Sequence, residues 1–243
     1  MTRSQINSSS GELRGGFVDA SNLASSTPTF PVETGQHPEG ISVAYSPDLP
    51  DGTGGLGAFL VVWSDGAAGT VRSQIVAYPG RLVGQSNILF TRPAGLQIWT
   101  TDIAYSPTDR VFLVGWTLVP TNRSTQMVRL DLSGRPLGAA TTLSTGPPLF
   151  LCGNFEFPWV CAGVSVAWNP ISREFGVAFT DGTTSSDGHM TLARVQGNGA
   201  VAGRSTVADA GQSYALAINA ATGHYVAASS RNIDIIGVEF AGD

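Results

Sequence analysis

The chain has 243 residues, of which 42% are hydrophobic and only 13% are charged, and its formal net charge is −5. This composition excludes an intrinsically disordered chain, which combines few hydrophobic residues with a high net charge. The negative charge also argues against nucleic-acid binding through a basic face. No stretch reaches the roughly 18 consecutive apolar residues of a membrane-spanning helix, and residues 1–30 contain no apolar core of a signal peptide.

Residues 1–10 are polar and rich in serine. Residues 11–15 (Gly-Glu-Leu-Arg-Gly) place two glycines four positions apart, a spacing that returns three times later in the chain. We expect residues 16–19 to form a strand after this turn. Residues 22–40 are expected to be a long connection, because they contain Pro28, Pro31 and Pro38.

A repeated hairpin organises the rest of the chain. Each copy has two apolar runs of strand length, rich in Val and aromatic residues and joined by a turn with Pro, Gly or Asp, which predicts a β-hairpin. The copies recur 60, 63 and 50 residues apart, at the anchors Val43, Ile103, Val166 and Leu216. Self-similarity at this period indicates a solenoid, a propeller or an array.

Three of these copies continue into a third and a fourth predicted strand. The third runs are residues 71–78, 125–132 and 190–196, and each is followed by a glycine pair and a short fourth run. Four antiparallel strands per unit are typical of a propeller blade. We therefore predict an all-β fold: a single four-bladed β-propeller domain over residues 1–243, with blades at about 41–90, 98–143, 163–207 and 213–240.

The fourth copy has three predicted strands, near residues 214–219, 224–229 and 233–240. The glycine pair of residues 11–15 suggests that the N-terminal strand supplies the fourth. We thus expect the last blade to combine residues 213–240 with residues 11–20, three strands plus one, which would remove the exposed edges of an open array. The alternative is an open fragment of a larger propeller.

Two blades share an aromatic residue followed by an acid at the end of the second strand. These pairs are Trp63 with Asp65 and Phe179 with Asp181. Aromatic faces stack on sugar rings and carboxylates bind their hydroxyls, so the four residues are candidate ligand-binding residues. The alternative is that the rings pack between blades while Asp-Gly forms the turn.

The first hairpin loop contains Asp48 and Asp51, which invite a calcium interpretation. The alternating oxygen ligands and final Glu of a calcium-binding loop are absent, however. Asp, Gly and Pro favour turns for backbone reasons. We therefore expect a solvated turn and predict no metal site.

An insertion at residues 146–161 separates the second blade from the third. It holds both cysteines of the chain, Cys152 and Cys161, which can form a disulfide if their Cα atoms lie within about 7 Å. That bond would imply an oxidising compartment. The apolar residues of the loop either cap one face of the ring or bind a partner; the aromatic ones are Phe150, Phe155, Phe157 and Trp159.

The sequence contains no His-Glu-x-x-His, Gly-x-Ser-x-Gly or phosphate-loop motif, so no catalytic residue and no cofactor are predicted. The pattern Val-Ala-Tyr-Ser-Pro, then Phe-Leu-Val-x-Trp and Gly-Arg-Pro-Leu-Gly, resembles the repeats of secreted and surface β-propeller proteins of bacteria of the myxobacterial type. The resemblance covers residues 41–243. It implies blades but transfers no catalytic residue, since that family includes adhesins, lectin-like binders and structural modules.

These observations favour a non-enzymatic binding module that presents loops on a propeller face to a glycan or protein partner. One alternative is a structural component of a virion, an injection device or a surface assembly, which would self-assemble. Another is a glycan-active enzyme, which would need paired carboxylates on one face. We expect an extracellular, cell-surface or particle-associated location, without nucleic-acid binding or a membrane span.

Overall fold

The computed structural model describes residues 11–18, 27–36, 38–119, 123–146, 163–181, 189–207, 214–231 and 234–240. This part of the chain is all-β. No helix in it has the length and hydropathy of a membrane span. The strands are β1 Gly11–Gly15, β2 Phe30–Gln36, β3 Pro38–Pro50, β4 Leu56–Asp65, β5 Thr70–Ala77, β6 Arg81–Thr91, β7 Gln97–Ser106, β8 Val111–Val119, β9 Arg123–Leu130, β10 Thr141–Gly146, β11 Val164–Asn169, β12 Glu174–Asp181, β13 His189–Gln196, β14 Val201–Val207, β15 Tyr214–Ile218, β16 Tyr225–Arg231 and β17 Asp234–Phe240.

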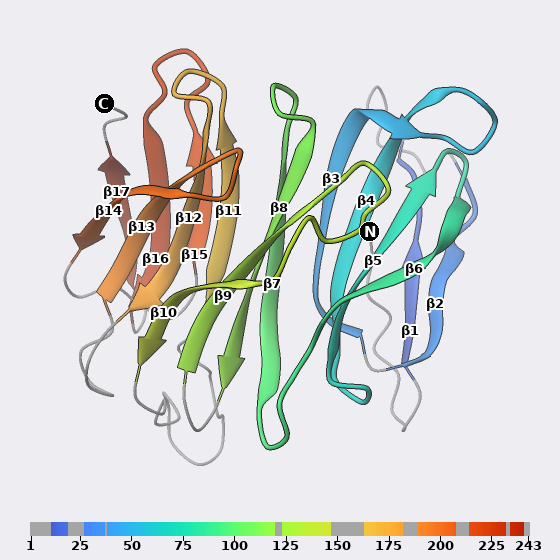
Figure 1. The fold of residues 1–243 in the computed structure, drawn as a ribbon, viewed down its shortest axis with the longest axis horizontal. Helices are drawn as coiled ribbons and strands as arrows, with labels where there is room; N and C mark the ends of the chain where they lie inside the picture. The colour runs from blue at the N-terminus through green and yellow to red at the C-terminus, as the bar shows by residue number, and fades with distance from the viewer. Residues whose placement is uncertain are drawn as a thin grey trace.

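Consecutive strands pair in antiparallel order to form separate sheets. Three sheets have four strands, β3–β6, β7–β10 and β11–β14, while β15–β17 form a three-stranded sheet and β1–β2 a two-stranded one. In Figure 1 the β1–β2 sheet lies on the right, and the β11–β14 and β15–β17 sheets overlap on the left. The predicted four-stranded antiparallel units are thus found for three of the four repeat copies.

The first strand of each large sheet contacts the first strand of the next. β3 lies against β7, β7 against β11, and β11 against β15. Side chains join these strands: the Ser42 hydroxyl donates to the Thr101 carbonyl at 2.8 Å, and the Ser165 hydroxyl donates to Oδ2 of Asp102 at 2.9 Å. The backbone N–H of Leu216 donates to the Ser165 hydroxyl at 3.1 Å. A polar connection therefore runs along the innermost strands from β7 to β15.

The core lies between neighbouring sheets rather than inside any one of them. The apolar runs of the repeat supply it, because each central strand is covered on both faces. Trp116 and Phe112 of β8 pack in one cluster with Leu60 of β4. Phe175 and Val177 of β12 pack in another cluster with residues of β8 and β11. Burying such large side chains stabilises the fold by about 1.5–3 kcal/mol each.

The predicted closure of the last blade by the N-terminal strand is not confirmed in the part of the chain that the structure describes. β1 pairs with β2, with Leu13 opposite Glu33 and Arg14 opposite Pro31, and the three-stranded sheet ends at β17. Residues 11–15 are extended rather than a turn, because Leu13 is buried against Val61 and Trp63 of β4. The closed four-bladed ring is accordingly not confirmed, and the predicted connection at residues 22–40 contains β2 and the start of β3.

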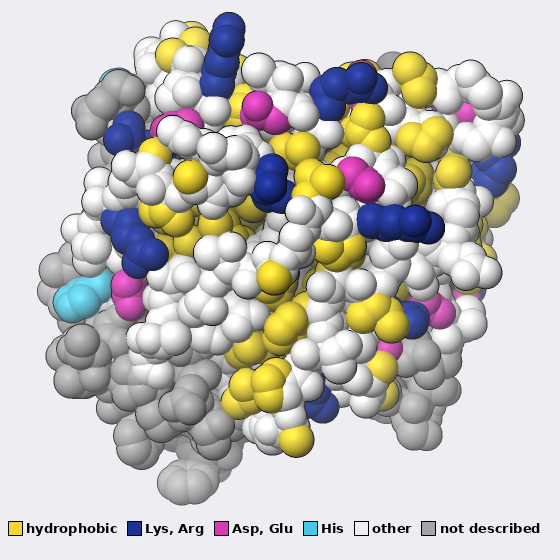
Figure 2. All heavy atoms as spheres, in the orientation of Figure 1, with side chains coloured by type: hydrophobic (Ala, Val, Ile, Leu, Met, Phe, Trp, Pro, Cys, Tyr) yellow, Lys and Arg dark blue, Asp and Glu magenta, His cyan; other side chains and the backbone are white. Residues whose placement is uncertain are grey.

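Charged side chains of both signs are interspersed on the face shown in Figure 2. Apolar side chains appear between them.

Candidate functional site

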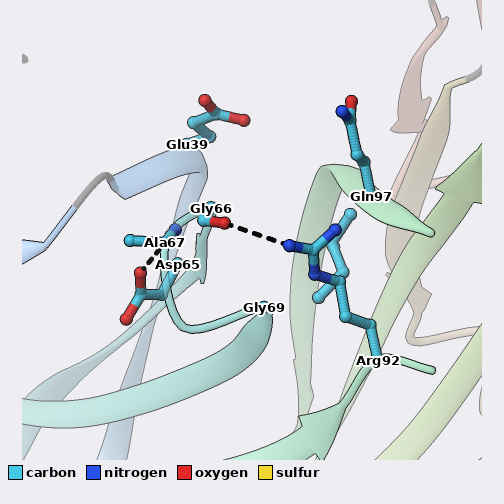
Figure 3. Close-up of a pocket in the computed structure, with 8 residues that line it drawn as sticks. Glu39, Asp65, Gly66, Ala67, Gly69, Arg92 and Gln97 are labelled. Atoms are coloured by element: carbon cyan, nitrogen blue, oxygen red, sulfur yellow. Dashed lines mark hydrogen bonds between the residues drawn. The ribbon is translucent and has the colours of Figure 1, made fainter. Parts of the chain in front are cut away.

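A pocket of about 280 Å³ lies between the first two four-stranded sheets. One wall comes from the start of β3 and from the turn between β4 and β5, and the other from the segment after β6 and the start of β7. Its lining residues are Glu39, Asp65, Gly66, Ala67, Gly69, Arg92, Gln97 and Ile98 (Figure 3).

Asp65 builds the first wall by fixing the β4–β5 turn. Its Oδ1 accepts hydrogen bonds from the backbone N–H groups of Ala67 (3.1 Å) and Ala68 (3.0 Å). The N–H of Gly69 donates to the Asp65 carbonyl at 2.7 Å, and Gly69 has a φ of 65°, which favours glycine. Asp side chains commonly fix turns in this way. Since Asp65 has no exposed surface, its carboxylate is part of the scaffold.

Arg92 joins the two walls. Its backbone N–H donates to the Gly69 carbonyl at 2.9 Å, and its Nη2 donates to the Gly66 carbonyl at 3.4 Å. The Arg92 side chain lies over Gly69 so closely that a Cβ there would be 2.2 Å from Arg92 Nε. Substitution of Gly69 would therefore displace Arg92 and change the pocket.

Glu39 and Gln97 extend from opposite walls on the same side of the pocket (Figure 3). Glu39 pairs with Ser64 in the β3–β4 ladder, and Gln97 begins β7. A carboxylate only accepts hydrogen bonds when ionised, a guanidinium only donates, and a primary amide does both. Together with Arg92, these side chains offer donors and acceptors to a small polar ligand, while Ile98 adds an apolar contact.

The sequence-predicted ligand residues do not gather in one place. Trp63 and Phe179 are fully buried, in two different clusters of the core, and present no ring face to solvent. Asp181 ends β12 opposite His189 of β13. Of the four, the pocket includes only Asp65. These positions favour the packing interpretation of the aromatic residues, and a ligand role for the four stays a prediction.

The acids of the first hairpin loop make local contacts instead of a cation site. Asp48 accepts a hydrogen bond from the Tyr105 hydroxyl and lies 3.7 Å from Nε of Arg110. Asp51 accepts from the N–H groups of Thr53 (2.7 Å) and Gly55 (3.0 Å). The hydrogen bond from Thr53 in particular lowers the pKa of Asp51. Among the described residues, no group of three or more His, Cys, Asp or Glu could hold a metal.

The predicted partner loop lies outside the described residues, as do both cysteines of the predicted disulfide. These are Phe150, Cys152, Phe155, Phe157, Trp159 and Cys161.

Sequence reasoning missed Glu39, Arg92 and Gln97. They lie in different units of the chain and share no motif, so only the folded arrangement brings them together. A weak signal did exist, because Arg92 and Gln97 lie in the short link between two predicted blades, where loops that carry function are common.

No family model matches the sequence, and no curated protein matches it. Among solved structures, the chain is similar to a glycoside hydrolase family 43 β-1,3-galactosidase solved with galactodeoxynojirimycin. The identity is 8%, the TM-score is 0.44, and the alignment covers 89% of this chain and 72% of that chain.

Proposed function

We propose that the protein is a binding module that holds a single sugar residue of a glycan in the pocket between the first two four-stranded sheets. The observation that carries this proposal is the set of Glu39, Arg92 and Gln97 around a space of about 280 Å³. That volume lies just below the usual range for small-molecule pockets, so the ligand is a small one. Sugar hydroxyls both donate and accept hydrogen bonds, as this lining requires.

Binding without turnover fits the two carboxyl groups of the pocket. Hydrolysis of a glycosidic bond needs two carboxyl groups that flank it, roughly 5–9.5 Å apart. Asp65 is fully buried and engaged by its own turn, so Glu39 is the one pocket carboxylate left to meet a ligand. An excess of a bound glycan incubated with the protein should therefore be recovered unchanged.

Thermal unfolding in the presence of individual monosaccharides and oligosaccharides tests the proposal. A ligand of the native state at 100 times its dissociation constant adds about 2.7 kcal/mol of stability. In a chain of this size that raises the unfolding midpoint by about 5–10 °C. We expect one sugar class to produce such a shift and the others to produce none.

The variant Gln97→Ala removes an exposed pocket side chain and should reduce the shift at least several-fold while leaving the ligand-free midpoint unchanged. Gln196→Ala, at an exposed glutamine that does not line the pocket, is the matched control and should respond like the wild type. An equal shift in wild type and Gln97→Ala would place the sugar elsewhere and refute the proposed site.

A further inference from the structure

Each large sheet has two faces, and residues at equivalent positions of the repeat lie on equivalent faces. We call the face turned toward the following sheet the forward face, and the opposite one the rear face. Leu60 of β4 lies on a forward face and packs with Ile103 and Tyr105, on the rear face of the next sheet. Leu113 of β8 likewise packs with Val166 of β11. Every interior contact in the row therefore joins a forward face to a rear face.

The rear face of the first four-stranded sheet is only partly covered. The β1–β2 sheet packs on its outer half, where Val61 and Trp63 are fully buried. On the inner half, Val43 is 43% and Tyr45 is 54% exposed. The repeat-equivalent residues of the second sheet, Ile103 and Tyr105, are 6% and 9% exposed. β3 therefore presents an apolar surface that a neighbouring sheet covers elsewhere in the row.

The forward face of the last sheet is exposed to solvent at β15 and β16. Val226 of β16 is 42% exposed, whereas Leu60 and Leu113, at the same position of the repeat, are fully buried. Ala217 of β15 is also exposed, whereas its equivalent Ala104 is buried. The molecule thus has an open rear face at one end of the row and an open forward face at the other.

We propose that these two faces bind each other between copies of the chain, so that Ala217 and Val226 of one copy pack on Val43 and Tyr45 of the next. The interior sheets show what covers each face, since a forward face meets a rear face at every step of the row. The two ends lie on opposite sides of the molecule (Figure 1), which favours a second copy over the chain's own far end. The inference does not depend on the sugar pocket.

This contact is heterologous, because it joins two different surfaces. Head-to-tail contacts of this kind produce rings or open filaments rather than closed dimers. The wild-type protein should therefore form assemblies of more than two chains. Their average molecular mass should rise with protein concentration.

Light scattering after size exclusion, over a hundredfold range of concentration, tests the proposal with Tyr45→Arg and Val226→Arg. Each variant keeps one functional face, so each alone should be monomeric, whereas an equimolar mixture of the two should form a dimer and nothing larger. Val201→Arg, at a residue of β14 that is 38% exposed, is the control, because its sheet lies at neither end of the row, and it should assemble like the wild type. Unchanged circular dichroism and unfolding midpoints would show that the variants fold.

A photo-crosslinking amino acid at position 45 distinguishes contact between copies from closure of one chain on itself. Crosslinks between chains, mapped to the peptide that contains Val226, support the proposal. A monomeric wild type at every concentration would overturn it, as would a crosslink to Val226 within a single chain or loss of assembly in Val201→Arg.

Discussion

Replacing Asp102 with alanine should destabilise the contact between the second and third four-stranded sheets. Asp102 lies on β7, and its Oδ2 accepts hydrogen bonds from the Val166 N–H at 2.7 Å and from the Ser165 hydroxyl at 2.9 Å, both on β11. Its Oδ1 accepts from the N–H of Ile103 at 2.9 Å. One side chain thus satisfies donors on two sheets, and Ser165 continues the connection by accepting from Leu216.

The magnitude follows from the two hydrogen bonds that cross between the sheets. A hydrogen bond to a charged group contributes about 1.5–3 kcal/mol, and a buried donor left without its acceptor costs about 1–3 kcal/mol. Val166 is buried, so its N–H has poor access to water after the substitution. Allowing for local relaxation, we expect Asp102→Ala to lower the free energy of unfolding by about 3 kcal/mol and the midpoint by about 6–12 °C.

Urea unfolding followed by tryptophan fluorescence, with a parallel thermal scan, measures this loss. Asp51→Ala is the control, because Asp51 accepts its hydrogen bonds from Thr53 and Gly55 of its own exposed loop, and its loss of stability should be clearly smaller than that of Asp102→Ala. A double-mutant cycle of Asp102→Ala with Ser165→Ala should show coupling of about 1 kcal/mol or more. A free energy of unfolding of Asp102→Ala within about 0.5 kcal/mol of wild type would refute the reasoning.

Two further predictions concern packing and pH. Gly176→Ala should lower stability by about 1–3 kcal/mol in urea unfolding, because its Cβ would lie 2.2 Å from Cε1 of Tyr225, whereas Gly138→Ala, with nothing within 4 Å, should have no such effect. Burial raises the pKa of Asp131, but hydrogen bonds from Ser133 and Arg135 outweigh it and hold the pKa below its ordinary value of 3.8. The ionised group therefore stabilises the fold above that ordinary value, and this stability is lost as pH falls through the lower folded pKa. Asp131→Asn should accordingly have a lower midpoint than wild type at pH 6, and the difference should shrink as the pH falls below 3.8; a difference that stays constant with pH would contradict this account.

The strands of the large sheets were predictable because the residues that form them carry their own signal. Apolar runs such as Phe112 to Trp116 are buried on both faces, and the turns between them contain Pro, Gly or Asp, so hairpins follow from local sequence. The closure of the last blade was not predictable in the same way. Residues 11–15 share the glycine spacing of three turns, but burial of Leu13 against the first large sheet decides their pairing.

Proline content also misled the prediction for residues 22–40. Pro31 lies in β2, which pairs with β1 in a two-stranded sheet, and Pro38 is the first residue of β3. Both are positions where a strand tolerates the missing N–H. The pocket could not be predicted from the sequence for another reason. Glu39, Arg92 and Gln97 come from three segments whose proximity depends on how two sheets pack.

A glycan array probed with the wild type and with Gln97→Ala tests the central claim most directly. The account predicts that the wild type binds glycans that share one terminal sugar residue, and that Gln97→Ala loses this binding while Gln196→Ala keeps it. Retention of the same glycans by Gln97→Ala, or no binding by the wild type, would contradict the assignment of the pocket between the first two four-stranded sheets as a sugar site.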